Sequence, residues 1–396
     1  MKTLRVFEAF AGIGAQYSAL ENLHEQNSDY SFEVVGISEW FINALLAYKA
    51  IHFPGDTVSN IPQSREELLK ELNRFEFSWD SVHSYDIKRL STEKLRQLYE
   101  ANTLSKNIGS IDKISLCDLN QNVDLLIYSF PCQDLSTGGK TQGMTQNSGT
   151  RSALIWEIKR ILNDLNNEHR LPKYLLMENV RAIFSEKNRK DLNLWEEFLS
   201  ALGYQQSEII LNSRNFGIPQ DRNRAFILSV RGEKPIELSS LQSSGTRSGP
   251  HLRNFLHYKY EEKDEPYLSE ANEAQLNRTP SREEMWKINQ LVSWDQNNKE
   301  GVYKRDFAYT ITCNMDRSNT AGLLQYKGAL GDTYRRLTIR EAFGLMGFQD
   351  ADYENVKKLG LSYRQMNKLI GNSIVVDVLE GIFKLIYEDF NNAGEV

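Results

Sequence analysis

The pattern of hydrophobic and polar positions alternates between strands and helices over the first 38 residues. Residues 4–9 form a short, mostly apolar run. After a glycine-containing turn, Ala15, Ala19 and Leu23 recur at four-residue spacing, and a second apolar run follows at Phe32–Ser38. Four-residue spacing is typical of one face of a helix, and short apolar runs bounded by turns are typical of buried strands. This order predicts a parallel α/β sheet.

The same rhythm resumes after residue 122. It predicts strands at Val123–Ser129, Lys173–Met177, Ser207–Leu211 and Arg224–Val230, and helices at Leu154–Leu165 and Leu192–Leu202. In between, residues 52–110 hold two polar helical segments, and residues 51–110 carry 8 basic against 9 acidic side chains. This balance leaves the insert without the surplus of positive charge that binds nucleic acid, so we interpret it as a solvated helical decoration.

The last third of the chain has a different character. Residues 239–248 are a polar, linker-like stretch, and residues 240–350 lack the strand–helix rhythm. From Tyr363 to Phe390, apolar residues recur at three- and four-residue spacing, which predicts one long amphipathic helix. We therefore expect a larger α/β domain at residues 1–235 plus 363–396, and a smaller, mostly irregular or β domain at residues 236–362.

Composition narrows the class of protein. A chain of 396 residues, 40% hydrophobic and 25% charged, is long enough for two or three ordinary globular domains. It has no apolar run long enough to span a membrane and no secretory signal at its start. Three cysteines without a C-x-x-C pair argue against a disulfide scaffold and a structural zinc site, and favour a reducing cytosol. The net charge of −6 restricts any nucleic-acid contact to a local basic region.

A glycine turn and a carboxylate are the first candidates for ligand binding. Residues 11–14 (AGIG) connect the first strand to a helix, where backbone can approach a ligand or simply close a tight turn. Tyr17 stands where a dinucleotide fingerprint has its third glycine. Glu39 ends the next strand, where doubly wound folds place a ribose-binding acid, and Trp40 offers a flat surface for a purine. Glu39 alone could be a solvated strand end, but the combination favours a nucleotide-like cofactor.

Two further strand ends carry reactive side chains. Cys132 follows Pro131 directly after a predicted strand, and Glu178 and Asn179 end another. A cysteine is most often an inert thiol, but a polar, glycine-rich loop follows this one, as expected of a lid over a nucleophile. With the glycine turn and Glu39, these make four strand ends that carry candidate residues. All four would line one edge of one sheet, which predicts an active site there.

A third motif alternates polar and charged residues. In an extended chain, Gln220, Arg222 and Arg224 would share one face. An arginine pair on one face can bind a phosphate or stabilise a developing anion, although a solvated edge strand gives the same pattern.

Together these motifs resemble the DNA (cytosine-5) methyltransferases, especially the bacterial restriction–modification type, almost end to end. The resembling segments are FEAFAGIGA (7–15), Glu39-Trp40, Asp112 in GSIDKI, PCQ (131–133), ENV (178–180), QDRNR (220–224), RRLTIREAFGLMGF (335–348) and GNSIVV (371–376). The resemblance implies a Rossmann-like methyltransferase domain that uses S-adenosylmethionine, with a small target-recognition domain.

The resemblance also implies the catalytic roles. Cys132 would add to C6 of a cytosine that is flipped out of duplex DNA. Glu178 would protonate the base at N3, and Arg224 would donate to O2. Arg222 and Asn179 would hold the pocket and the edge of the base.

Cofactor and DNA contacts follow from the same resemblance, and no metal is implied. S-adenosylmethionine would be held by Phe10, Gly12, Gly14, Glu39, Trp40, Asp112, Asn372 and Ser373. Gln133 would fill the space left by the flipped base. Thr310 and Thr312 match the threonine segment of the recognition region, and Arg317 lies in a candidate base-reading loop. Residues 301–341 carry 7 basic against 4 acidic side chains, which favours DNA on this region.

Three rival functions remain open. A dinucleotide-dependent oxidoreductase shares the glycine turn and Glu39 but gives no role to Cys132 with Glu178 and Arg224. A DNA-binding relative without catalysis would not need those three residues. A tRNA cytosine-5 methyltransferase has the same fold but a shorter recognition region. We expect double-stranded DNA as the substrate and a cytoplasmic, bacterial or phage-encoded monomer that binds no membrane. A cognate restriction endonuclease acting on the same site is the expected partner.

Overall fold

The computed structural model describes most of the chain, in ranges that are residues 2–131, 151–232, 234–243, 251–257, 265–276, 290–295, 300–317, 320–328 and 331–392. The chain folds into two compact units. Unit 1 comprises Met1–Leu211, Asn223–Ser243 and Leu379–Val396; unit 2 comprises Asn212–Arg222 and Ser244–Val378. These boundaries differ from those expected, because residues 212–222 and 363–378 belong to unit 2, and residues 236–243 belong to unit 1. The division of labour between a catalytic and a recognition domain stays a prediction.

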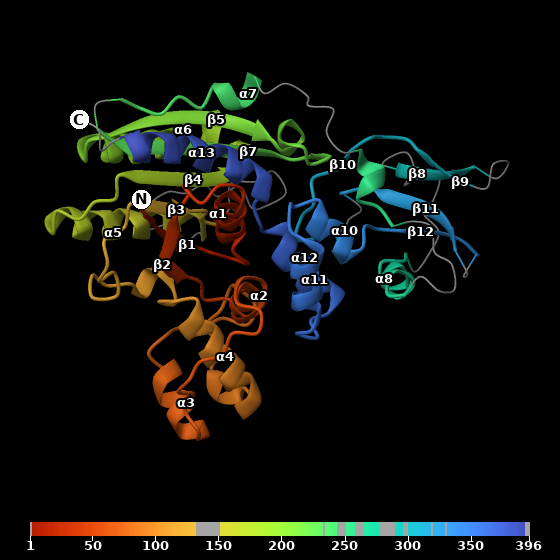
Figure 1. The fold of residues 1–396 in the computed structure, drawn as a ribbon, viewed down its shortest axis with the longest axis horizontal. Helices are drawn as coiled ribbons and strands as arrows, with labels where there is room; N and C mark the ends of the chain where they lie inside the picture. Colours follow the sequence, from red (N-terminus) through yellow and green to blue (C-terminus); the bar gives the residue numbers. More distant parts are fainter. Residues whose placement is uncertain are drawn as a thin grey trace. The chain divides into compact units, whose positions relative to one another are not determined.

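A six-stranded sheet forms the centre of unit 1, in the order β2-β1-β3-β4-β7-β5 (Figure 1). The strands are β1 (Leu4–Ala9), β2 (Phe32–Ser38), β3 (Leu125–Tyr128), β4 (Tyr174–Val180), β5 (Tyr204–Asn212) and β7 (Asn223–Arg231). Strands β2, β1, β3 and β4 pair in parallel, and β7 runs antiparallel to β4. All six predicted strands are confirmed, and the α/β fold class with them.

Helices cover the sheet of unit 1 (Figure 1). They are α1 (Ala15–Gln26), α2 (Ile42–His52), α5 (Ile155–Asn167), α6 (Glu186–Ala201) and α13 (Val376–Asn392). One apolar cluster joins side chains of β1, β3, β4 and β7 to α5 and α6, and it includes the fully buried Trp195, whose ring contacts those of Tyr128 and Trp156. All four residues of β3 are buried, which explains why the strand reads as a continuous apolar run.

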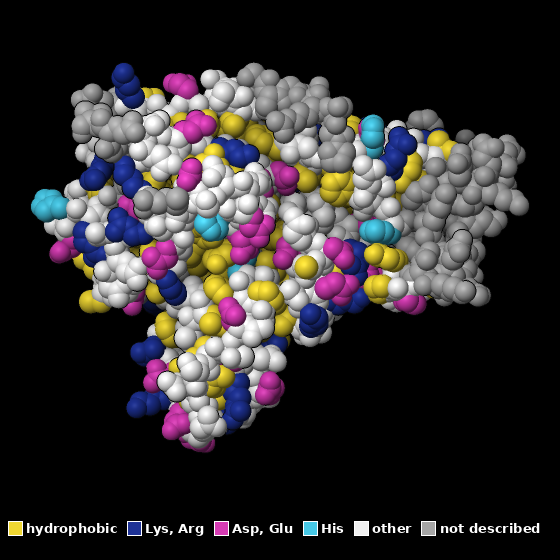
Figure 2. All heavy atoms as spheres, viewed as in Figure 1, with side chains coloured by type: hydrophobic (Ala, Val, Ile, Leu, Met, Phe, Trp, Pro, Cys, Tyr) yellow, Lys and Arg dark blue, Asp and Glu magenta, His cyan; other side chains and the backbone are white. Residues whose placement is uncertain are grey.

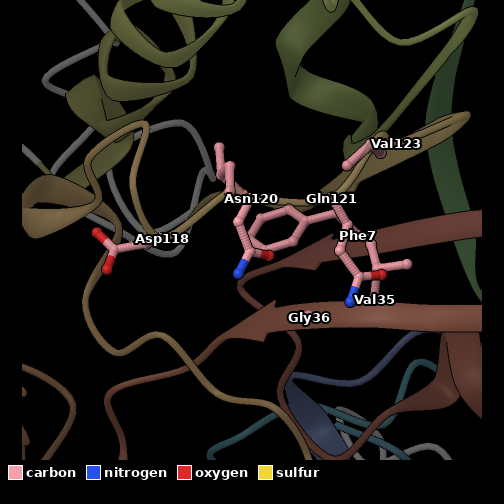
Figure 3. A pocket seen from close by; sticks show the side chains of 8 residues that line it. Phe7, Val35, Gly36, Asp118, Asn120, Gln121 and Val123 are labelled. Carbon is pink, nitrogen blue, oxygen red and sulfur yellow. The ribbon is translucent and has the colours of Figure 1, made fainter.

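The insert forms helices α3 (Arg65–Leu72) and α4 (Thr92–Leu104) on the β2 side of the sheet (Figure 1). Each begins at a serine whose hydroxyl caps the first turn, Ser64 for α3 and Ser91 for α4. Basic and acidic side chains are interspersed over these helices in Figure 2, as the balanced charge predicts. The insert is also joined to the sheet, because Asn107 forms a parallel bridge with Ile37 of β2.

Unit 2 contains a small sheet and several helices. Its four-stranded sheet has the order β12-β11-β8-β9, and β6 pairs with β10. The elements are β6 (Gln220–Asp221), α8 (Tyr267–Glu273), β8 (Gln290–Asp295), β9 (Glu300–Tyr303), β10 (Ala308–Tyr309), β11 (Leu323–Gly328), β12 (Gly331–Arg335), α10 (Ile339–Gly344), α11 (Asp350–Lys357) and α12 (Tyr363–Gly371). Helices α10 and α11 were not expected, although the capping boxes at Thr338 and Gln349 signal both starts.

The single C-terminal helix expected over residues 363–390 is wrong. The chain instead forms α12 and α13, separated by residues 372–375. The guanidinium of Arg222 donates to the carbonyls of Gly371 at 3.4 Å and Ser373 at 2.7 Å. Carbonyls at a helix end lack intrahelical partners, so this buried side chain stabilises the break. The apolar spacing continues across the break, which is why periodicity alone predicts one helix.

We expect Gly371→Ala to lower the free energy of unfolding by roughly 1–3 kcal/mol. A Cβ at this position would lie 2.2 Å from the nitrogen of Cys313 and 2.3 Å from the carbonyl carbon of Thr312. Both atoms are backbone, so no side-chain rotation relieves the overlap. Denaturant unfolding of the two proteins measures the difference. Gly344→Ala is the control, because its Cβ would meet only Phe255 at an ordinary 3.4 Å; equal losses in both variants would contradict the argument.

Candidate active site

Four parallel strands end side by side in unit 1. Ala9 of β1 pairs with Ser38 of β2 and Tyr128 of β3, and Tyr128 pairs with Met177 of β4. The residues directly after these are Phe10, Glu39, Ser129 and Glu178. The structure therefore brings the predicted strand ends together at one sheet edge, where open α/β sheets bind ligands.

The two glycines of the turn, Gly12 and Gly14, differ in their surroundings. Gly14 begins α1 with a φ of +79°, and a Cβ there would lie 2.1 Å from Nε2 of the buried His52. Gly12 has a φ of +61°, and no atom lies within 4 Å of its Cβ position. Gly14 is thus needed for close packing, whereas the turn is open above Gly12. Phe10 also has a left-handed φ, +58°, which is rare for a non-glycine residue and marks a constrained turn.

The carboxylate of Glu39 is tied to this turn. One oxygen accepts from the Gly12 N–H at 2.9 Å, and the other from the Phe41 N–H at 2.7 Å. Burial raises the pKa of Glu39 to about 7, against the backbone N–H groups of Phe41, Gly12 and Trp40, which lower it. Each carboxylate oxygen can accept a second hydrogen bond. The half-buried Trp40 follows directly, with its carbonyl held by the Ser78 N–H at 2.7 Å.

Asp112 lies on a short 3₁₀ turn, Ile111–Lys113. Its carboxylate accepts from the Ser110 hydroxyl at 2.5 Å and lies 3.4 Å from Nζ of Lys113. Arg160 of α5 donates to the carbonyls of Ile111 at 3.1 Å and Ile114 at 2.7 Å. This arginine holds both ends of the turn, and sequence reasoning missed it because its partners are backbone atoms.

Glu178 and Arg224 meet across β4 and β7. In the antiparallel pairing Val180 lies opposite Arg224, and Glu178 lies two residues along. Nε of Arg224 is 3.2 Å from Oε1 of Glu178, and the two side chains are 17% and 10% exposed. The structure thus joins an acid and an arginine that the sequence places 46 residues apart.

The backbone beyond β3 is held from two sides. Asn179 donates its amide to the carbonyl of Phe130 at 3.1 Å. The buried hydroxyl of Ser152 donates to the carbonyl of Pro131 at 2.7 Å. Asn179 therefore contacts the chain that leads to residue 132. Sequence reasoning missed Ser152.

Two of the predicted residues, Cys132 and Gln133, lie outside the described residues, and their roles stay predictions. Asn372 and Ser373 lie in unit 2, where Asn372 ends α12 and the Ser373 hydroxyl donates to the carbonyl of Ile374 at 3.3 Å. Their roles toward the cofactor also stay predictions.

Of the three residues expected to share one face, Gln220 and Arg222 bind the same residue, whereas Arg224 binds elsewhere. Gln220 accepts from the N–H of Ile311 at 2.9 Å, and Arg222 donates to the carbonyl of Ile311 at 2.7 Å. Both therefore bind backbone within unit 2, whereas Arg224 pairs with Glu178 in unit 1. The cause is a turn at Asp221, where the Arg222 N–H donates to the Gln220 carbonyl at 3.0 Å and separates β6 from β7.

The three candidate DNA contacts in unit 2 differ in their surroundings. The Thr310 hydroxyl donates to the carbonyl of Asp221 at 2.8 Å, so it holds β6 beside β10. The Thr312 hydroxyl lies 3.3 Å from that of Thr320. Arg317 is 58% exposed, and Asp316 lies 3.6 Å from its Nε. Arg317 is the charged member of the three, and more than half of its side chain is exposed to solvent.

Part of the positive charge over residues 301–341 is buried. Arg335 is fully buried and binds Glu341 at 2.7 Å. Arg340 is buried as well and binds Glu270 at 2.9 Å. Two of the seven basic side chains and one of the four acidic ones, Glu341, are therefore paired inside unit 2. Five basic and three acidic side chains remain, so the surplus falls from +3 to +2.

A buried acid beneath the glycine turn was also missed. Glu8 of β1 is fully buried and accepts from the Tyr48 hydroxyl at 3.2 Å. Burial raises the pKa of Glu8 to about 8, and burial lowers the pKa of His52, whose ring contacts Tyr48, to about 3. Burial thus favours the uncharged form of both groups. A glutamate within an apolar strand was the available signal.

The described ranges contain no group of three or more His, Cys, Asp and Glu side chains arranged to hold a metal ion. Over the same part of the chain, no helix combines the length and the apolar character that a membrane span requires.

Comparison with known proteins gives relatives over nearly the whole chain. The chain is 38% identical to the orphan methyltransferase M.SssI of Spiroplasma monobiae, with 97% of each chain covered. It is 34% identical to the type II methyltransferase M2.ScrFI of Lactococcus lactis subsp. cremoris, over 97% of this chain and 99% of that one.

The fold is also that of solved structures. Dnmt2 methyltransferase of S. pombe superposes with a TM-score of 0.61 at 20% identity, covering 98% of this chain and 100% of that one. The Entamoeba histolytica methyltransferase EhMeth gives 0.62 at 16% identity, covering 98% and 99%. Residues 83–388 match the family model of the C-5 cytosine-specific DNA methylases. With that match and two relatives above 30% identity along almost their full lengths, the chain belongs to the C-5 cytosine-specific DNA methylase family.

Proposed function

We propose that the protein transfers a methyl group from S-adenosylmethionine to C5 of a cytosine in duplex DNA, through a covalent bond between Cys132 and C6. The observation that carries the proposal is the contact between Glu178 and Arg224 at 3.2 Å. It supplies an acid and a hydrogen-bond donor together, which cytosine needs at N3 and O2. The glycine turn and Glu39 end neighbouring strands of the same sheet.

The chemistry starts from the poor nucleophilicity of cytosine C5. The thiolate of Cys132 adds to C6, and the electrons of the C5–C6 double bond make C5 nucleophilic. Glu178 gives N3 a proton, and Arg224 donates to O2, so negative charge does not accumulate on the ring. Once C5 has taken the methyl group, loss of the C5 proton and elimination of the Cys132 thiolate restore the C5–C6 double bond, and N3 gives its proton back. A base stacked in a duplex must first be flipped out.

The residues at the sheet edge fit S-adenosylmethionine, which supplies the electrophilic methyl group when bound. The open space above Gly12 is a cradle that a Cβ would fill. The Glu39 carboxylate can accept further hydrogen bonds from the ribose hydroxyls, and the ring of Trp40, the next residue, can stack on the adenine. The proposed holders are Phe10, Gly12, Glu39, Trp40, Asp112, Asn372 and Ser373, with Gly14 acting through the packing of the turn.

We expect cofactor affinity to rise with pH through the range in which Glu39 ionises. The ribose hydroxyls donate to a carboxylate, and the pKa of Glu39 is raised to about 7, so acid protonates it and weakens binding. The gain between about pH 6 and about pH 8 should be roughly tenfold. Calorimetry with S-adenosylhomocysteine in the absence of DNA measures it. Glu39→Gln should bind weakly with no such pH dependence, and a wild-type affinity that is flat over this range would contradict the role of Glu39.

We expect Arg317→Ala to change DNA recognition without changing cofactor affinity. If Arg317 contacts a base, discrimination at that position should fall by about 1–3 kcal/mol. If it contacts a phosphate, affinity should fall about equally for all sequences, with a shallower salt dependence. Binding to cognate and altered duplexes at several salt concentrations separates the two cases. A loss of S-adenosylhomocysteine binding without DNA would contradict the assignment of Arg317 to DNA.

Bisulfite sequencing of plasmid DNA from cells that express the protein tests the function directly. Methylated cytosines within one short sequence are expected, and unmodified DNA would overturn the proposal. A bacterial or phage context fits relatives such as M.SssI and an orphan methyltransferase of Bacillus phage SPR. The relatives carry both orphan and type II names, so a cognate endonuclease, a cytoplasmic location and a monomeric state remain proposals.

A further inference from the structure

The side-chain amide of Asn107 holds the backbone of Glu39. Its Oδ1 accepts from the Glu39 N–H at 2.9 Å, and its Nδ2 donates to the Glu39 carbonyl at 3.0 Å. Asn107 is only 3% exposed. A carboxamide has a donor and an acceptor in one plane, so it can make the two bonds that a neighbouring strand would make. Asn107 thus extends the pairing of β2 by one residue, to Glu39.

The backbone around Asn107 lies along the same strand. The Ile37 N–H donates to the Lys106 carbonyl at 3.3 Å, and the Ile108 N–H donates to the Ile37 carbonyl at 2.9 Å. The Ser38 hydroxyl adds a bond to the Gly109 carbonyl at 2.8 Å. Since β2 is an edge strand of its sheet, this segment covers the edge at its carboxyl end.

Asn107 is itself fixed by the insert. Asn102, in the last turn of α4, accepts from the Asn107 N–H and, through its Oδ1, from the Asn107 side chain, both at 2.9 Å. The Gly109 N–H donates to Oδ1 of Asn107 at 3.3 Å. The amide therefore uses both of its donors and both acceptor sites, which fixes its orientation.

We propose that Asn107 is a positioning residue for the cofactor-binding carboxylate, and that the insert takes part in cofactor binding through it. The path of contacts runs from α4 through Asn102 and Asn107 to the Glu39 backbone. From there the Glu39 side chain reaches the Gly12 N–H. The proposal rests on the proposed role of Glu39, and it replaces our interpretation of the insert as a solvated decoration.

The test compares affinities for S-adenosylhomocysteine without DNA. Asn107→Ala leaves the N–H and carbonyl of Glu39 without these bonds, so the carboxylate is less well held, and we expect about tenfold weaker binding. Ser105→Ala is the matched control. It removes a buried hydroxyl that donates to the Ala101 carbonyl at 2.6 Å, at the same end of α4 but without contact to Glu39. Its affinity should equal that of the wild type.

A double-mutant cycle shows whether the effect passes through Glu39. In the Glu39→Gln background, Asn107→Ala should cost little further affinity, because the ribose contact is already lost. An analogue of S-adenosylhomocysteine without the 2′ and 3′ hydroxyls gives a second readout. The wild type should prefer the natural compound, and Asn107→Ala should narrow that preference, which a general loss of stability would not do.

The outcomes separate this inference from the proposed function. Equal affinities of Asn107→Ala and Ser105→Ala would overturn the inference, with the role of Glu39 intact. Wild-type affinity in Glu39→Gln would overturn that role and the inference with it. If Asn107→Ala does not fold, Asn102→Ala takes its place, because it keeps both bonds to Glu39 and removes the contact that orients the amide. It should weaken binding about threefold, and an unchanged affinity would overturn the inference.

Discussion

The Cys132→Ser variant is expected to fold, to bind S-adenosylhomocysteine like the wild type and to lose methyl transfer by roughly 10⁴-fold or more. A serine hydroxyl is almost wholly protonated near neutral pH, whereas a thiol reaches its nucleophilic thiolate form readily. Without addition at C6, the C5 carbon does not become nucleophilic. Single-turnover transfer of a labelled methyl group to DNA measures the loss.

The matched control for this variant is Cys117→Ser. Cys117 is an exposed free cysteine, and we assign it no role in the reaction. Its activity should equal that of the wild type. DNA with 5-fluorocytosine at the target should trap the wild type and Cys117→Ser as covalent adducts, because C5 then has no proton to lose, but should not trap Cys132→Ser. Methylation by Cys132→Ser within about tenfold of the wild-type rate would remove Cys132 from the nucleophile role.

The second large effect is expected from Glu178→Gln, with turnover reduced about 10²–10⁴-fold and DNA affinity nearly unchanged. A glutamine can still accept a hydrogen bond from Arg224, so the contact across β4 and β7 can persist. It cannot give a proton to N3, and without that proton the addition of the thiolate loads negative charge onto the ring. Single-turnover rates and equilibrium DNA binding, measured on the same duplex, separate the two effects.

Glu186→Gln serves as the control for charge, because Glu186 is an exposed acid at the start of α6, shortly after Glu178 in the chain. It should retain the wild-type rate. Arg224→Ala should resemble Glu178→Gln, with its deficit in the chemical step. A loss of activity in Glu178→Gln that weaker DNA binding explains completely would contradict the role of an acid at N3.

The sheet could be predicted from the sequence because its strands contain apolar runs, and the inner strands β3 and β4 are buried almost throughout. The predicted bounds of β1 and β2 equal those in the structure. For β4 the prediction stopped at Met177, since polar residues follow, but the strand continues to Val180. Glu178 and Asn179 still pair with β7, and this pairing holds the acid at the sheet edge. Apolar patterning ends where the site begins, so it locates the edge but not the strand's last residues.

Contacts between side chains and backbone could not be predicted in this way. Asn107, Arg160 and Ser152 each bind carbonyl or N–H groups of segments far away in the chain. Every residue has a backbone carbonyl, so the sequence does not show which residue such a side chain will bind. The same reason hides the break after α12, where the buried Arg222 stabilises a helix end although the apolar spacing continues.

The interleaving of the two units limits how segments of unit 2 can be exchanged between relatives. Unit 2 takes Asn212–Arg222 from between β5 and β7, and Gln220 and Arg222 bind both backbone groups of Ile311. A chimaera that replaced only residues 244–378 would place a foreign backbone against these two side chains and would leave the break after α12 without its matched arginine. A chimaera that keeps these contacts therefore has to exchange the eleven-residue segment and the long segment together, although 21 residues, nine of them in β7, separate the two segments along the chain.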